Sequence, residues 1–417
     1  MKKLNKFMVI ILISVLFFDM AISCKTVAAA GAADVTSQLT NKLKIKGVNS
    51  FRIFNDILYN SINGTLFATD LINGSKTRIY KSTDSTEWSY DVTAEMIYIK
   101  TKETVTAIDR MNGEKKWTFN RYTVGGNEIR MLSCEKGMVY ISATKYNNAD
   151  KIYALDVSTG KEKWTKTLSS KFSKYPFFHL EGNVLYFNTM DHIYAVDNET
   201  GVNKWNLDLA SVHSKGLTQD SYDLQTWPLF TQNNIIYTST LVSTSGGVML
   251  LREIKLVALD MNTGKVQWMN NMISISSMEL YKDKLLLGDN SFHVYNTETG
   301  QEEWQFKTGG RVDSIKVVQN VAYCRSDNNT FYALDLNTHQ EKWHLTAPNS
   351  LTNSTALIEE RFYFESNDGY FHVLDKLNGQ EILQFKLEGK PIHSAFAVVA
   401  EVLYYLTDNC LYAVSIP

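Results

Sequence analysis

Short stretches in which apolar and polar residues alternate recur along most of the chain. Examples are "IYALD" at 152–156, "IYAVD" at 193–197, "SIKVVQ" at 314–319 and "RFYFESN" at 361–367. These stretches are rich in aromatic and β-branched side chains, which suit pleated, half-buried surfaces. Alternation with a period of two predicts β-strands with one buried face, so the pattern indicates a strand-rich protein.

One phrase follows a strand repeatedly: an Asp, a Gly four places later and a Trp eight places later. The complete copies are Asp109, Gly113 and Trp117; Asp156, Gly160 and Trp164; Asp197, Gly201 and Trp205; and Asp260, Gly264 and Trp268. Two later copies keep part of the phrase, as Gly300 with Trp304 and Asp335 with Trp343. In the outer copies Arg78 and Leu383 stand at the Trp position. The spacing of about 40 residues predicts a repeat architecture.

Each position of the phrase has a physical reason. The Asp ends a strand, where its carboxylate can accept hydrogen bonds from the backbone N–H groups of the next turn. The Gly can adopt the positive φ that a tight hairpin requires. The Trp then lies on the following strand and presents a large flat surface to a neighbour. We therefore interpret the phrase as a structural element.

The repeat predicts an all-β fold, a β-propeller of four-stranded antiparallel blades. Eight copies contain all four strands, whereas the last copy, at the C-terminus, has only three. The segment "NKLKIKG" at 41–47 can supply the missing outer strand. We therefore expect a single propeller domain at 41–417, with eight or nine blades, closed by pairing of the N- and C-terminal strands.

The pattern "YALDxxTGxxxW" resembles the repeat of the pyrroloquinoline-quinone-type propellers. This group includes quinoprotein alcohol dehydrogenases and the outer-membrane assembly lipoprotein BamB, and its members are mostly eight-bladed. The resemblance runs from about residue 45 to the end of the chain. It implies that the repeated Trp docks between adjacent blades, and it makes BamB-like partner binding the nearest precedent for function.

The quinone chemistry of the group is not implied for this chain. Members that bind the quinone use adjacent cysteines and a Ca²⁺ ion, but Cys134, Cys324 and Cys410 lie far apart, and no CxxCH motif is present. The histidines lack zinc-binding spacing, and no GxSxG or P-loop occurs. We expect no catalytic residues, no metal and no cofactor. The alternative is a propeller enzyme, either a degenerate quinoprotein dehydrogenase or a carbohydrate-active enzyme whose site leaves no local motif.

The N-terminal residues have the pattern of an export signal. Lysines precede the apolar run "FMVIILISVLFF", which is followed by "MAISCK". Ala21 and Ser23 before Cys24 resemble the lipobox of bacterial lipoproteins, in which the cysteine carries the lipid. We expect a signal peptide at 1–23, lipidation of Cys24 and a flexible tether at 24–40. Free secretion after cleavage within "TVAAAGAA" is the alternative.

Two insertions distinguish one repeat from the others. The Asp197-to-Asp260 interval is 63 residues long, about twenty more than the others. The excess falls at 210–223 and at 240–253, in loops that an antiparallel blade places on one face. Loops on a rigid scaffold often carry binding residues. The predicted partner-binding residues are His213, Leu217, Tyr222, Met249 and Leu250.

The charge balance excludes one class of partner. The net charge of −2 gives no basic excess of the kind that nucleic-acid binding requires. We expect an exported, lipid-anchored monomer that acts as a non-enzymatic scaffold for an envelope or secreted protein.

Metabolic labelling with a fatty-acid analogue tests the predicted lipid on Cys24. The unsubstituted protein should be labelled and membrane-bound, whereas Cys24→Ser should be unlabelled and released, because the thiol is the acyl acceptor. Label that survives the substitution would contradict the assignment, and release of both forms would indicate ordinary signal cleavage.

Overall fold

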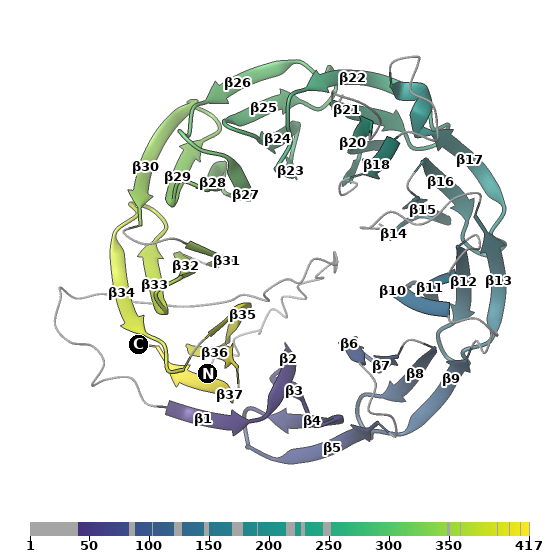
Figure 1. Cartoon of the computed structure of the whole chain (residues 1–417), viewed down its shortest axis with the longest axis vertical. Coiled ribbons are helices and arrows are strands. Elements are labelled where there is room, and N and C mark those ends of the chain that lie inside the picture. Colours follow the sequence, from purple (N-terminus) through teal and green to yellow (C-terminus); the bar gives the residue numbers. More distant parts are fainter. Residues whose placement is uncertain are drawn as a thin grey trace, which may run out of the picture.

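The computed structural model describes residues 41–82, 88–101, 103–120, 127–145, 150–168, 178–189, 191–213, 222–226, 230–244, 252–347, 351–358, 360–389, 391–399, 401–408 and 410–416. Within them the strands form nine separate sheets, arranged as blades around a common axis (Figure 1). The blades are antiparallel and are numbered here along the chain. The expected β-propeller is confirmed, and the number of blades is nine.

The strands of the first blades are, in blade 1, β2 (Val48–Phe54), β3 (Ile57–Ile62), β4 (Thr65–Asp70) and β5 (Lys76–Lys81); in blade 2, β6 (Ser89–Val92), β7 (Met96–Lys100), β8 (Thr104–Asp109) and β9 (Lys115–Asn120); and in blade 3, β10 (Asn127–Glu135), β11 (Met138–Lys145), β12 (Lys151–Asp156) and β13 (Glu162–Thr167). The middle blades comprise, in blade 4, β14 (Phe178–Glu181), β15 (Val184–Asn188), β16 (His192–Asp197) and β17 (Asn203–Asp208); in blade 5, β18 (Tyr222–Thr226), β19 (Phe230–Gln232), β20 (Ile235–Thr244), β21 (Arg252–Asp260) and β22 (Val266–Met272); and in blade 6, β23 (Ser277–Tyr281), β24 (Lys284–Gly288), β25 (Phe292–Asn296) and β26 (Glu302–Phe306). The last blades comprise, in blade 7, β27 (Val312–Val318), β28 (Val321–Ser326), β29 (Thr330–Asp335) and β30 (Gln340–Thr346); in blade 8, β31 (Leu351–Ile358), β32 (Arg361–Ser366), β33 (Tyr370–Asp375) and β34 (Glu381–Lys386); and in blade 9, β35 (Pro391–Val399), β36 (Val402–Thr407), β37 (Cys410–Ser415) and β1 (Asn41–Lys46). A short 3₁₀ helix, η2 (Leu209–Val212), follows β17.

The ring is closed between the two ends of the chain. β1 pairs antiparallel with β37, from Asn41 opposite Val414 to Lys46 opposite Cys410. The N-terminal strand thereby becomes the outer strand of blade 9, as the sequence predicted. This pairing gives blade 9 its fourth strand and covers the edge of β37 that would otherwise be unpaired.

Each blade has its turns on two opposite faces of the ring. β15 begins at Val184 opposite Asp197, where β16 ends, so this end carries the Asp turns. We call it the turn face. β16 begins at His192 opposite Asp208, at the other end of the blade. This loop face carries the hairpins between second and third strands and the connections that enter each blade.

The apolar core lies between neighbouring blades rather than within one layer. One cluster joins Tyr186 and Ile193 of blade 4 to Ile236 and Val257 of blade 5, and the other buried clusters of the described residues repeat this pattern around the ring. A blade therefore gains most of its burial from its two neighbours, as expected for repeats that cannot bury their faces alone.

The repeated Asp organises the turn that the sequence predicted. Asp197 Oδ1 accepts hydrogen bonds from the N–H groups of Glu199 and Thr200 at 3.1 and 3.0 Å and from the Thr200 hydroxyl at 2.9 Å. These bonds, the Thr200 hydroxyl foremost, hold the pKa of Asp197 below its usual range. Gly201 closes the turn with φ at 71°. Asn296 replaces the Asp in blade 6 and accepts the same two backbone bonds.

The repeated Trp lies across the turn glycine of the next blade. The Trp164 indole N–H donates to the carbonyl oxygen of Asn198 at 2.7 Å. A Cβ atom placed on Gly201 would lie 2.8 Å from the ring of Trp164, closer than atoms can approach without a shift. The same arrangement places Trp117 on Gly160, Trp205 on Gly264, Trp268 on Gly300 and Trp343 on Gly379. The glycine is thus required for two reasons: the turn needs a residue with positive φ, and the indole ring leaves no room for a side chain.

Two of the departures from this rule show what it tolerates. Trp304 meets His339 in place of a glycine, and the two rings stack with centroids 4.9 Å apart and planes inclined by 10°. His339 adopts φ of 57°, so it keeps the turn geometry. In blade 1 the β-bulge between the third and fourth strands lies at Leu66/Phe67, two residues earlier than its counterpart at Ala154/Leu155 in blade 3, and Ile79 rather than the exposed Arg78 packs against Gly113.

Glycine-to-alanine substitutions separate the two requirements. Gly201→Ala and Gly74→Ala impose the same left-handed strain, since both glycines have φ above 70°. At Gly74, however, no atom of the described residues lies within 4 Å of the added methyl group. We expect Gly201→Ala to lower the free energy of unfolding by about 1–3 kcal/mol more than Gly74→Ala does, because of overpacking. Equal losses in denaturant titrations would contradict the indole contact.

Candidate partner-binding site

Blade 5 carries a hairpin that extends beyond its outer strand on the loop face. β20 and β21 remain paired through Val242 opposite Glu253 and Ser243 opposite Arg252. The outer strand β22 ends earlier, where Met272 pairs with Ile254. The hairpin of the second insertion therefore projects from the rim of the loop face on a continuous pair of strands, which gives it a rigid base.

His213 links the first insertion to the base of this hairpin. Its Nε2 lies 2.7 Å from Thr240 Oγ1 and its Nδ1 lies 3.1 Å from Glu253 Oε2. Burial lowers the pKa of His213, while the Glu253 carboxylate opposes the shift. A neutral imidazole can donate to the carboxylate through Nδ1 and accept the Thr240 hydroxyl through Nε2.

The same network continues to the outer strand. Glu253 also contacts Lys255 Nζ at 3.0 Å, and Lys255 donates to Asn271 Oδ1 at 2.5 Å. The start of the first insertion is also anchored in the protein interior, because Leu209 and Val212 of η2 are buried. The described parts of both insertions are therefore held on one rigid base.

Exposed apolar side chains lie beside this base. Ile273, directly after β22 on the loop face, is 93% exposed, and Met269 on the outward side of β22 is 47% exposed. Exposure of this degree at the end of an ordered strand leaves apolar area that a partner can cover. A hollow of about 530 Å³ lies between β22 and blade 6 and is lined by Asn270, Asn271, Tyr295, Thr299, Gly300, Gln301 and Glu302.

The predicted partner-binding residues lie in different situations. The His213 side chain is buried and holds the insertion in place. The backbone of Tyr222 belongs to β18 and pairs with Thr244 at the same end of the blade. Leu217, Met249 and Leu250 lie outside the described residues. Ile273, Met269 and Glu253 were not among the predicted residues, because a single apolar residue in or after a strand and a Glu in a hairpin carry no specific signal in the sequence.

Blade 8 contains a Ser–His–Glu arrangement that bears on the enzymatic alternative. His372 Nε2 lies 2.9 Å from Ser366 Oγ, and Nδ1 lies 2.6 Å from Glu381 Oε1. The spacing is that of a nucleophile and its base, but Ser366 is only 1% exposed and also donates to Asp368. A nucleophile must be reachable by substrate, so this geometry favours a structural role.

The equivalent position in blade 6 supports this reading. His293 contacts Glu302 through Nδ1 at 2.6 Å and Asp289 through Nε2 at 2.8 Å. Both histidines stand three residues before the repeated Asp or Asn, and both glutamates six residues after it. The cluster is thus a recurring contact between blade strands. In the described part of the chain, no group of three or more His, Cys, Asp or Glu residues could hold a metal ion.

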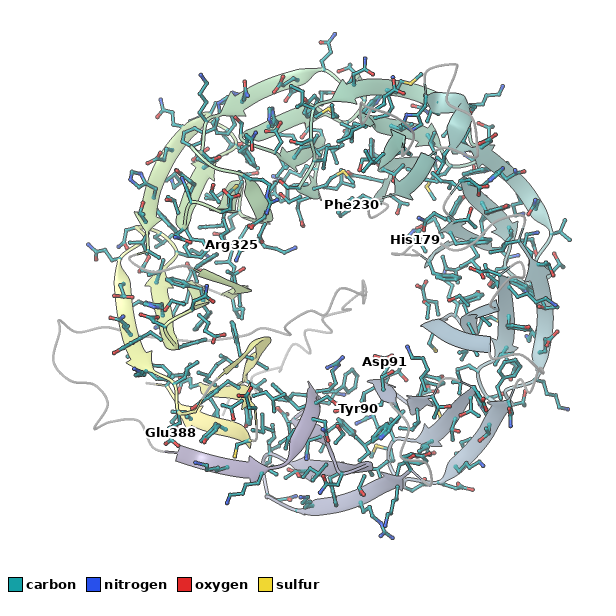
Figure 2. All side chains as sticks on the ribbon, in the orientation of Figure 1. Tyr90, Asp91, His179, Phe230, Arg325 and Glu388 are labelled. Carbon is teal, nitrogen blue, oxygen red and sulfur yellow. The ribbon has the colours of Figure 1, made fainter. Side chains whose placement is uncertain are left out.

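Titratable groups also lie on strands close to the ring axis, as Figure 2 shows for Asp91 and His179. Burial raises the pKa of Asp91, although Arg52 and Lys100 oppose the shift. Burial lowers the pKa of His179, whose Nε2 lies 3.0 Å from Thr231 Oγ1. Shifted groups of this kind occur at active sites and in structural networks alike. Neither residue could be predicted from the sequence, since neither belongs to a motif.

Nine antiparallel blades, with turns built on the repeated Asp and Gly and with most neighbouring rims joined by Trp, define a β-propeller with quinoprotein-type repeats. The family model described as outer membrane protein assembly factor BamB matches residues 101–281 and 280–416. The chain belongs to this family. The resemblance noted from the sequence is confirmed.

Several solved structures are similar to this chain at low sequence identity. BamB from Moraxella catarrhalis is 15% identical, with 79% of this chain and 96% of that chain covered and a TM-score of 0.48. A europium-containing methanol dehydrogenase is 11% identical, with coverages of 94% and 95% and a TM-score of 0.52. The quinohemoprotein alcohol dehydrogenase ADHIIG from Pseudomonas putida HK5 is 11% identical, with coverages of 91% and 76% and a TM-score of 0.51. Among curated proteins, no sequence matches the chain.

Proposed function

We propose that the protein is an exported, lipid-anchored, non-enzymatic scaffold of the bacterial envelope that binds another protein on its loop face. Membership of the BamB family supports this function, since the family is described by assembly of outer membrane proteins. Cys24 would carry the lipid, and the propeller would act as a monomer.

The main observation behind the proposal is the group of features at the loop face of blade 5. The extended hairpin, the insertion anchored by His213 and the exposed Ile273 meet on one face. A partner that covers Ile273 and Met269 would find apolar anchors beside the polar groups of Asn270 and Asn271. That mixture of an apolar centre and a polar rim is typical of protein interfaces.

A propeller enzyme remains the second candidate function. It is favoured by the likeness in fold to quinoprotein dehydrogenases, and by the shifted pKa values of Asp91 and His179 near the axis. Likeness in fold alone does not transfer chemistry, and the adjacent cysteines of the quinone-binding members have no counterpart in this sequence. We therefore place the scaffold function first.

Crosslinking in the native envelope, followed by mass spectrometry, tests the loop face. Replacing residues 214–220 by a short Gly–Ser linker leaves His213 and β18 intact, and Ile273→Asp changes only an exposed side chain. Both variants should lose the captured protein while the free energy of unfolding changes by no more than about 0.5 kcal/mol for the point substitution.

Val202→Asp is the matched control, because Val202 is 63% exposed but lies on the turn face of blade 4. Capture that persists in the Ile273→Asp variant and disappears in the Val202→Asp variant would show that the partner binds the other face.

A further inference from the structure

The turn face carries exposed apolar side chains at one repeated position. Two residues after the repeated Asp stand Ile72, Met111 and Leu377, which are 82%, 80% and 62% exposed. The same position holds polar residues in blades 3 to 7, namely Ser158, Glu199, Asn262, Glu298 and Asn337. In blade 9 it falls on residue 417, outside the described residues.

These apolar turn tips are grouped on one side of the ring. Leu377 belongs to blade 8, Ile72 to blade 1 and Met111 to blade 2, so they flank blade 9 on both sides, along the lower part of Figure 1. We call this group the apolar arc. Val202 is exposed on the same face as well, but it lies in blade 4 and at another position of the turn.

The tips are held rigidly by the turns beneath them. The backbone N–H groups of Ile72, Met111 and Leu377 each donate to the carboxylate of the repeated Asp, at 2.8, 2.9 and 2.7 Å. The turns therefore present the side chains outward at equivalent positions of neighbouring blades. Rigid presentation removes the freedom to fold the apolar groups back onto the protein.

The chain enters the propeller at this same place. Asn41 pairs with Val414, next to Ser415, which takes the position of the repeated Asp in blade 9. Asn41 therefore lies on the turn face, in the middle of the apolar arc. From Cys24 to residue 40 there are 17 residues, which can span at most about 60 Å. A lipid on Cys24 would keep this face within reach of the bilayer.

We propose that the turn face of blades 8, 9, 1 and 2 rests on a lipid bilayer, with Ile72, Met111 and Leu377 inserted into its interface. The tips stand on separate blades, each among polar turn residues, so they form no contiguous apolar centre of the kind that a protein interface buries. A fluid lipid interface accommodates separate side chains, and each one that leaves water contributes to binding. The inference rests on the proposed attachment at Cys24, and it orients the loop face of blade 5 away from the membrane.

Acidic and basic residues both lie beside the arc, since Arg110 precedes Met111 and the exposed Lys115 follows the same turn. Asp56, Glu95 and Glu401 are exposed in the hairpins between first and second strands, on the same face of blades 1, 2 and 9. Carboxylates at these places repel anionic headgroups. The arc therefore fits a neutral, zwitterionic lipid surface, and added anionic lipid should not strengthen the contact.

Environment-sensitive fluorophores on single introduced cysteines test the contact in the full lipidated chain. The chain is reconstituted on neutral phosphatidylcholine vesicles, with Ile72→Cys, Met111→Cys and Leu377→Cys as probes. Matched controls are Ser158→Cys and Asn262→Cys at the same turn position in other blades, and Ile273→Cys on the opposite face. The unsubstituted chain measures background labelling of Cys134, Cys324 and Cys410.

Emission from the three arc positions should shift to the blue and be quenched by spin-labelled lipid, while the three controls stay unchanged. In the Cys24→Ser protein, a combined Ile72→Asp, Met111→Asp and Leu377→Asp variant should partition onto vesicles roughly tenfold or more weakly than a combined Ser158→Asp, Asn262→Asp and Asn337→Asp variant.

Three outcomes would overturn the proposal. Arc probes that show no shift on lipid alone would do so, as would a shift that appears only after envelope proteins are added, which would indicate a protein partner. Equal shifts at all positions that grow with anionic lipid would indicate non-specific adsorption. Failure of the lipid attachment itself is seen separately, as loss of acyl label from Cys24.

Discussion

The contact of an indole ring with the glycine of the next blade is the interaction on which the structure depends. Trp164 lies flat over Gly201 and donates its N–H to the carbonyl of Asn198, so one side chain fixes both the distance and the orientation of blades 3 and 4. Because the apolar core lies between blades, each such contact also brings the core residues of two sheets into contact with each other. Truncation of a buried Trp costs about 3–5 kcal/mol, which is a large share of a protein's net stability.

The same constraint leaves the two faces of the ring free to vary. With blade spacing set at the rim, turns such as the one at Ile72 can vary their outward side chains, and the hairpin of blade 5 can lengthen without disturbing its neighbours. The exceptions show the limits: His339 replaces a glycine only by stacking on Trp304, and Ile79 replaces a Trp only through a displaced β-bulge. At these two boundaries the replacing group still fills the gap between blades, whereas at Gly74, in blade 1, no atom of the described residues lies within 4 Å of the equivalent position.

The repeat could be predicted from the sequence because each of its residues acts over a few positions. Asp197, Gly201 and their counterparts build local turns, and the alternation of strands is also local. The Trp contact was inferred from resemblance and regularity. The partners of His213 could not be predicted, because Thr240 and Glu253 come from another insertion. The exposure of Ile273 and Ile72 could not be predicted either, since an apolar residue in a strand or turn is more often covered by a neighbour.

A double-mutant cycle at the boundary between blades 3 and 4 tests the central claim most directly. The free energy of unfolding is measured for the unsubstituted chain, Trp164→Ala, Gly201→Ala and the double variant. If the indole is what excludes a side chain at residue 201, Gly201→Ala should be milder by about 1–3 kcal/mol once Trp164 is gone, leaving only the cost of the left-handed φ. Strict additivity of the two substitutions would contradict the account.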